Sequence, residues 1–176
     1  VRGIRGLSSM DIRLAREFGY RIKLLGRARM RDGKLEAGVF PTLVNHTYLL
    51  ARVGGAYNAV RVEGNAVGSL FLHGLGAGSL PTASSILSDI MARLNNYRYE
   101  YKKQNYMQKP DYTTDITLKV YVRYKETDVH GILNFTKVHE QYTSEDSNYV
   151  IGDILLSELI AKRDRLCGDD VFVANI

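Results

Sequence analysis

The sequence lacks several features that define whole classes of protein. Its single cysteine, Cys167, excludes a disulfide within the chain and a cysteine-rich zinc site. No apolar run approaches the roughly 20 residues that a membrane-spanning helix needs. The first residues contain no apolar stretch of the kind found in secretory signal peptides. We therefore expect a cytoplasmic protein without membrane contact, and the four scattered histidines predict no metal site.

The chain has 19 acidic residues against 24 lysines and arginines, which gives a formal net charge of +5. Basic charge of this kind is also found in nucleic-acid-binding proteins. Residues 95–115 mix five tyrosines with basic residues, a composition that can stack single-stranded bases. We favour a different interpretation: these residues form a linker that lies along a neighbouring domain, with its tyrosine rings facing that domain. RNA binding stays an alternative, and we expect no nucleic-acid partner.

Residues 10–18 carry the signals of a short helix. Ser8 can cap the first turn, Asp11 places a negative charge near the N-terminus, and Gly19 ends the helix. The residues expected to face inward are Ile12, Ala15 and Phe18.

Residues 21–37 predict a hairpin. Apolar and basic residues alternate with period two, which indicates a half-buried strand, and Asp32-Gly33 is typical of a type I′ turn. The resulting opposite pairs are Arg29 with Glu36, Met30 with Leu35, and Ala28 with Ala37. This register places apolar beside apolar and cation beside anion, so the arginine stripe is mainly the solvent face of the hairpin. Pro41 is expected to end the second strand.

The middle of the chain predicts a helical turn at residues 47–53. A second hairpin follows, with strands at residues 56–63 and 66–73 around Gly64-Asn65. Residues 81–94 then predict an amphipathic helix. Its apolar stripe consists of Ala83, Ile86, Leu87, Ile90 and Leu94.

From residue 115 a second pattern predicts a small α+β module. The expected strands are residues 116–122, 132–142, 149–154 and 171–176. A helix within residues 155–166, ended by Gly168, lies before the last strand, so the expected order is β-β-β-α-β. The predicted fold class is α+β: a mixed or antiparallel sheet with helices on one face, followed by this module.

The segment Gly74-Leu75-Gly76-Ala77-Gly78 joins a predicted strand to a predicted helix. Glycines there let a ligand approach the backbone, and a helix N-terminus offers free N–H groups to a phosphate, carboxylate or carbonyl. The spacing matches neither the dinucleotide fingerprint nor a P-loop. A tight turn beneath a closely packed helix explains the same residues, so both interpretations stay open on spacing alone.

Stretches within residues 2–94 resemble, in order, the catalytic domain of the homoserine dehydrogenase family. They are Gly3-Ile4-Arg5-Gly6, Asp11-Ile12, Phe18-Gly19-Tyr20-Arg21-Ile22-Lys23-Leu24-Leu25-Gly26, Pro41-Thr42-Leu43-Val44, Asn58-Ala59-Val60, Glu63-Gly64-Asn65-Ala66-Val67-Gly68 and Gly74-Leu75-Gly76-Ala77-Gly78-Ser79-Leu80-Pro81-Thr82-Ala83. Phe40 stands where the family usually has His, and Leu75 replaces its usual Pro.

The resemblance implies part of an enzyme that reversibly reduces aspartate 4-semialdehyde to homoserine with NAD(P)H, in threonine, methionine and isoleucine biosynthesis. In the family a Rossmann domain binds most of the cofactor. That domain, the catalytic lysine and the acidic substrate-binding residues precede the stretch matching Gly3. We expect this chain to be a piece without catalytic residues, inactive alone. By the resemblance, Gly78 lies beside the cofactor, with Gly76 and Ala77 as neighbours, and the enzyme forms a homodimer.

Some members of the family add a regulatory ACT module, and residues 120–133 resemble its first strand and exit. The Pro-Gly turn is missing and a first helix has little room, so the tail resembles a degenerate ACT-like module, without threonine sensing. The expected domains are residues 1–94 (catalytic and dimerisation), 95–114 (linker) and 115–176 (ACT-like). The alternative is an amino-acid-binding regulatory or interaction fragment without catalysis.

Overall fold

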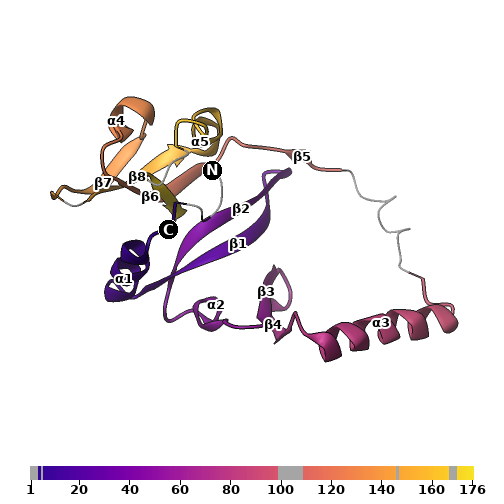
Figure 1. Ribbon diagram of the computed structural model, residues 1–176. Helices are drawn as coiled ribbons and strands as arrows, with labels where there is room; N and C mark the ends of the chain where they lie inside the picture. Colours follow the sequence, from indigo (N-terminus) through magenta and orange to yellow (C-terminus); the bar gives the residue numbers. More distant parts are fainter. Residues whose placement is uncertain (1–3, 5, 99–108, 146, 167–169) are drawn as a thin grey trace. The chain divides into compact units, whose positions relative to one another are not determined.

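The computed structural model describes residue 4 and residues 6–98, 109–145, 147–166 and 170–176 (Figure 1). The chain forms two compact units. The sheet unit combines Val1–Thr47 with Pro110–Ile176, and the hairpin unit is Tyr48–Lys109. These units run across the predicted division at residues 94 and 115, because the first 47 residues share a sheet with the tail. Tyr99, Tyr101 and Tyr106 of the expected linker, and Gly168, lie outside the described residues.

The sheet unit is built on one seven-stranded mixed sheet of strand order β1-β2-β9-β6-β8-β7, with β5 also paired to β2 (Figure 1). Its strands are β1 (Tyr20–Arg31), β2 (Lys34–Asn45), β5 (Asp111–Tyr112), β6 (Thr117–Tyr124), β7 (Lys137–Tyr142), β8 (Asn148–Leu155) and β9 (Phe172–Asn175). Its helices are α1 (Ser9–Glu17), α4 (Val129–Ile132) and α5 (Leu156–Ala161). The C-terminal strand β9 joins the two halves, because it pairs with β6 on one side and with β2 at Thr42 on the other.

The first hairpin has the predicted register. Arg29 lies opposite Glu36 and Met30 opposite Leu35, and the turn residues Asp32 and Gly33 both have positive φ, as a type I′ turn requires. The expectation that Pro41 ends the second strand is wrong, since β2 continues to Asn45. Within the described residues, the second edge of β2 pairs only at residues 34–35 and at Thr42, so Pro41, which has no N–H, is tolerated between them.

Helix α1 begins and ends one residue earlier than predicted, and its capping signals are the expected ones. Ser8 and Asp11 form a reciprocal capping box, and Gly19 follows the last turn with φ of +77°. The expected inward stripe is wrong in part. Ala15 is buried, but Ile12 is 40% and Phe18 65% exposed. The other buried residue of α1 is Asp11. Hydropathy alone would place this charged side chain at the surface.

The tail has the order β-α-β-β-α-β, because the one-turn helix α4 follows β6. The expected absence of a first helix, and the start of the second strand at residue 132, are therefore wrong. Asp128 makes the short helix possible, since its side chain accepts a hydrogen bond from the Gly131 N–H. The other strands and α5 fall where they were predicted.

The core of the sheet unit lies between the sheet and helices α4 and α5. Alternate residues of β6, β8 and β9 point into it, and Phe40 from β2 packs against the same cluster. Its fully buried members are Val120, Val122, Val129, Leu133, Val150 and Ile154. Helix α1 lies against the opposite face, beside Tyr20, Ile22 and Tyr121. Helices therefore flank both faces of this sheet, in place of the single face expected.

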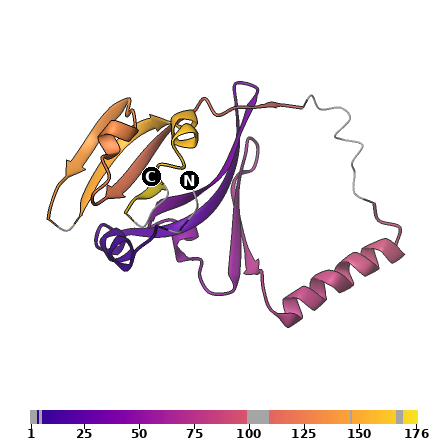
Figure 2. The same ribbon diagram turned by 45° about the horizontal axis from the view of Figure 1, so that its top comes forward.

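The hairpin unit consists of α2 (Leu49–Arg52), β3 (Tyr57–Gly64), β4 (Gly68–Leu75) and α3 (Ser79–Leu94), an uninterrupted helix in Figure 2. Strands β3 and β4 form a two-stranded sheet of their own. The predicted apolar stripe of α3 is exposed among the described residues, with Leu87 61% and Leu94 71% accessible. No helix in the described part of the chain is long and apolar enough to span a membrane.

Candidate functional site

The candidate site is the glycine segment between β4 and α3, in the hairpin unit. Strand β4 ends at Leu75, and the N–H of Gly76 donates to the carbonyl oxygen of Ala56 at 3.0 Å, just before β3 begins. The segment therefore remains attached to the hairpin after the strands separate. This attachment fixes where α3 starts, and so positions its N-terminus.

Gly76 is explained by packing within the hairpin unit. A Cβ at this position would collide with the side-chain amide of Asn58. Asn58 belongs to the Asn58-Ala59-Val60 stretch and lies opposite Gly74 in the strand register. The Asn58-Ala59-Val60 stretch and the glycine segment, both quoted above for the family resemblance, are therefore in contact. Gly76 is required by its own hairpin, whatever ligand approaches the segment.

Gly78 is the N-cap residue of α3 and has φ of +124°, a conformation that favours glycine. No side chain caps the helix, and the first intrahelical bond runs from the Thr82 N–H to the Gly78 carbonyl at 3.1 Å. The N–H groups of Ser79 and Leu80 precede that bond, and Pro81 has none. The helix N-terminus therefore presents two backbone donors and its positive dipole end beside Gly78.

This arrangement can bind an anion or polarise a carbonyl oxygen through backbone donors. It holds no acid, base or nucleophile of its own. The nearest ring cluster lies on the hairpin, where Tyr57 and His73 stack with centroids 4.8 Å apart and planes 9° apart. Sequence patterning missed this pair, because the two residues are far apart in the chain and meet only through the β3–β4 register. No group of three or more potential metal ligands gathers anywhere in the described ranges.

Comparisons with known proteins place these features in a family. The homoserine dehydrogenase family model matches residues 1–91. The homoserine dehydrogenase of Neisseria gonorrhoeae is 50% identical over 91 residues, 52% of this chain and 21% of that protein. That of Lactococcus lactis is 32% identical over 155 residues, 84% of this chain and 35% of the relative.

Solved structures agree. A homoserine dehydrogenase from Thiobacillus denitrificans superposes with a TM-score of 0.72 at 30% identity, over 98% of this chain and 46% of that one. The Staphylococcus aureus enzyme gives 0.60 at 30% identity, covering 99% and 45%. The match defines a mixed α+β fold shared with oxidoreductases, and the chain belongs to the homoserine dehydrogenase family. It spans less than half the length of these relatives.

Proposed function

We propose that the chain is part of an enzyme that reversibly reduces aspartate 4-semialdehyde to homoserine with NAD(P)H, and that it is inactive alone. Family membership over residues 1–91 carries this proposal. The described residues that resemble the family supply a positioned backbone and no catalytic side chain. The remainder of the enzyme therefore supplies the proton-transferring group and most of the cofactor site.

In this proposal the glycine segment lies against the cofactor. The uncapped N-terminus of α3 fits such a group, since the donors of Ser79 and Leu80 face an oxygen without competition from a capping side chain. Gly78 has no side chain and Ala77 a small one, and the Gly76 N–H holds the segment on the hairpin. When bound, the nicotinamide supplies the hydride that the carbonyl carbon accepts. The chain's own contribution is to bind and orient through its backbone.

The test compares this chain with the complete enzyme that contains it. Homoserine-dependent reduction of NAD or NADP, followed by absorbance, should occur with the complete enzyme and be undetectable with residues 1–176 alone. Activity of the chain alone would contradict the division of labour proposed here. A complete enzyme without this activity would contradict the proposed function itself.

We further propose that the hairpin unit contributes to a homodimer. One face of the β3–β4 hairpin carries four apolar side chains beside Asn58, and the other carries the Arg61–Glu63 ion pair. The apolar side chains are 42–60% exposed, and they are Val60, Val62, Leu70 and Leu72. A two-stranded sheet with such a face is stable only when another surface covers it. A second copy of the enzyme supplies that surface.

For the tail we propose an ACT-like module with a structural role. Its strand-helix-strand-strand-helix-strand order supports the ACT-like assignment. Three contacts with the N-terminal part support the structural role: the pairing of β9 with β2, the packing of Phe40 on the tail core, and the Arg123–Asp11 ion pair. A module joined in this way stabilises the first 47 residues of the chain.

A further inference from the structure

The face of the sheet opposite α4 and α5 contains a cavity. It lies under α1 and has a volume of about 290 Å³, near the lower end of the range for small-ligand sites. All of its walls belong to the sheet unit, so it is separate in sequence from the glycine segment. Its lining comes from α1, β1, β2, β6, β7, β8 and the C-terminal Ile176.

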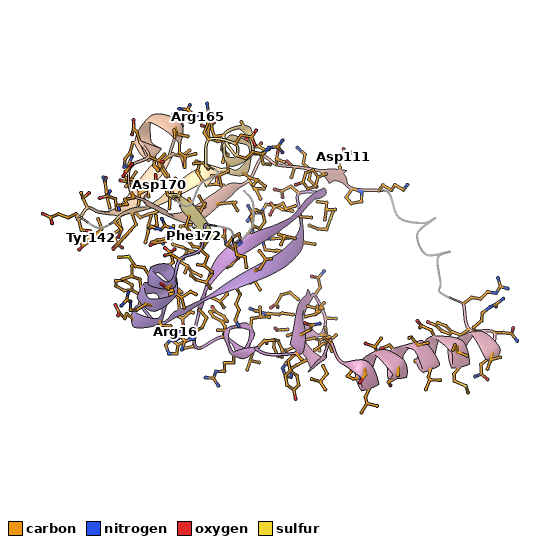
Figure 3. All side chains as sticks on the ribbon, viewed as in Figure 1. Arg16, Asp111, Tyr142, Arg165, Asp170 and Phe172 are labelled. Carbon is orange, nitrogen blue, oxygen red and sulfur yellow. The ribbon has the colours of Figure 1, made fainter. Side chains whose placement is uncertain are left out.

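The walls are rich in aromatic rings. Phe18 and Tyr20 line the cavity beside α1, and Tyr121 and Tyr149 line it from the sheet. The last two rings are 5.4 Å apart at 37°, and Tyr142, at the end of β7, stacks on Tyr149 at 5.4 Å and 18° (Figure 3 labels Tyr142). Aromatic faces carry negative quadrupole charge and attract cations placed over them. Aliphatic side chains, including Ile22, Leu43 and Ile151, and three charged residues complete the lining.

An exposed carboxylate, Glu140, lies beside these rings. The Tyr149 hydroxyl donates to Oε1 of Glu140 at 2.6 Å, and this hydrogen bond raises the pKa of Tyr149 to about 12. The hydroxyl therefore stays protonated at neutral pH and keeps the Glu140 carboxylate oriented at the cavity. Glu140 takes part in no ion pair among the residues that the structure describes.

Asp11, the other carboxylate that lines the cavity, has its partner within the fold. Both oxygens of Asp11 accept hydrogen bonds from Arg123, and one also binds Ser8. Lys119 lies directly opposite Asp153 in the strand register, and Asp153 is also paired with Nε2 of His139 at 2.9 Å. Glu140 is therefore the lining carboxylate that is left to a cationic ligand.

We propose that this cavity binds a small organic ammonium ion with an aliphatic body. The positive head would lie against the faces of Tyr121 and Tyr149 and pair with Glu140. The aliphatic part would contact Ile22, Leu43 and Ile151. The volume admits an ion of the size of tetramethylammonium or a short alkylammonium. This inference uses no residue of the glycine segment and does not depend on the proposed enzymatic activity.

The experiment titrates the 176-residue chain with tetramethylammonium, and in parallel with tert-butanol, an uncharged molecule of similar shape. The ring resonances of Tyr121 and Tyr149, followed by NMR, should shift saturably with the cation and not with the alcohol. Equal binding of both molecules would show a merely apolar gap and overturn the proposal. The absence of saturable shifts up to about 10 mM, which corresponds to roughly −2.7 kcal/mol, would also overturn it.

Two variants locate the recognition. Glu140→Gln removes the charge and keeps the shape, and should weaken the cation at least about tenfold, equivalent to about 1.4 kcal/mol. Tyr149→Phe keeps the ring but frees Glu140, and should weaken it less. Glu145→Gln, an exposed acid outside the lining, is the matched control and should bind like the parent chain. Unchanged affinity in Glu140→Gln would refute the role of the carboxylate.

Discussion

Arg123 on β6 and Asp11 on α1, 112 positions apart in the chain, form a buried ion pair. Their Nε and Oδ1 atoms are 3.0 Å apart, and a second hydrogen bond joins Nη2 to Oδ2 at 3.1 Å. Arg123 also donates to the carbonyl oxygens of Gly6 and Asp170, at 2.7 and 2.9 Å. One guanidinium thus connects the N-terminal segment, helix α1 and the start of β9. The pair makes the tail and the first helix parts of one folded unit.

Arg123→Met should destabilise the chain by about 3–5 kcal/mol, because it leaves a buried carboxylate without its cation. Urea unfolding followed by circular dichroism measures the change. The double variant with Asp11→Asn should lose less than the sum of the two single changes. Asp164→Asn is the control, since its pair with Arg163 is exposed and 3.9 Å long, and its loss should cost below about 1 kcal/mol. Equal losses in Arg123→Met and the control would contradict this interpretation.

Asp170 should make folding stability depend on pH in the acid range. Burial raises the pKa of Asp170, but hydrogen bonds from the Thr127 hydroxyl and from the backbone N–H groups of Glu126, Thr127 and Lys125 outweigh burial, so the net pKa is lowered. A lowered folded-state pKa stabilises the fold above the ordinary value of about 3.8, and this contribution is lost as pH falls through the folded-state pKa.

The measurement compares the parent chain with Asp170→Asn in urea at two pH values. The variant should be less stable by about 1–3 kcal/mol at pH 7, because hydrogen bonds to a charged acceptor are replaced by bonds to an amide. The difference should shrink at pH values of about 3 and below. A difference that stays constant over this range would show that the Asp170 charge does not matter.

Gly78→Ala in the complete enzyme should lower turnover by up to about a hundredfold, if the added Cβ displaces the cofactor or substrate by about 1 Å. The positive φ of Gly78 means that the same change also strains the backbone by about 1–3 kcal/mol. Gly68→Ala is the matched control, because Gly68 has φ of +74° and open space around it. Both variants should lower the melting temperature, and only Gly78→Ala should lower turnover. An equal loss of activity in both variants would show that the glycine segment is only a packing turn.

The homodimer proposal predicts a mass of about twice 19.8 kDa for this chain in sedimentation equilibrium at micromolar concentration. Leu72→Lys places a charge on the apolar face of the β3–β4 hairpin and should give monomers. His73→Lys, on the other face of the same strand, should leave the dimer intact. Monomers in the parent chain, or dimers in Leu72→Lys, would count against this face as the interface.

The tail should not bind threonine more tightly than about millimolar affinity, near −4 kcal/mol. The exit from β6 contains no Pro-Gly turn, and the N–H groups of its backbone instead donate to the Asp170 carboxylate, just before β9. Calorimetry with threonine measures this directly. A micromolar site would show that the structural role proposed for the tail is incomplete.

The sequence by itself determined the elements whose signals are local. The capping box at Ser8 and the type I′ turn at Asp32-Gly33 depend on neighbouring residues, and period two with that turn sets the pairing of Arg29 with Glu36. Collinear motifs also carried the family resemblance. The short helix α4 escaped prediction because a single turn held by Asp128 has no periodicity to detect.

Tertiary structure alone decided how distant segments meet. The pairing of β9 with β2 draws the tail into the same sheet as the first hairpin, although their patterns predict two separate domains. The sequence explains Asp11 only as an acid in the first helical turn, whereas the fold buries it against Arg123. The cavity beside Glu140 arises in the same way. Contacts between residues more than a hundred positions apart depend on which surfaces pack together, and local periodicity carries no information about that choice.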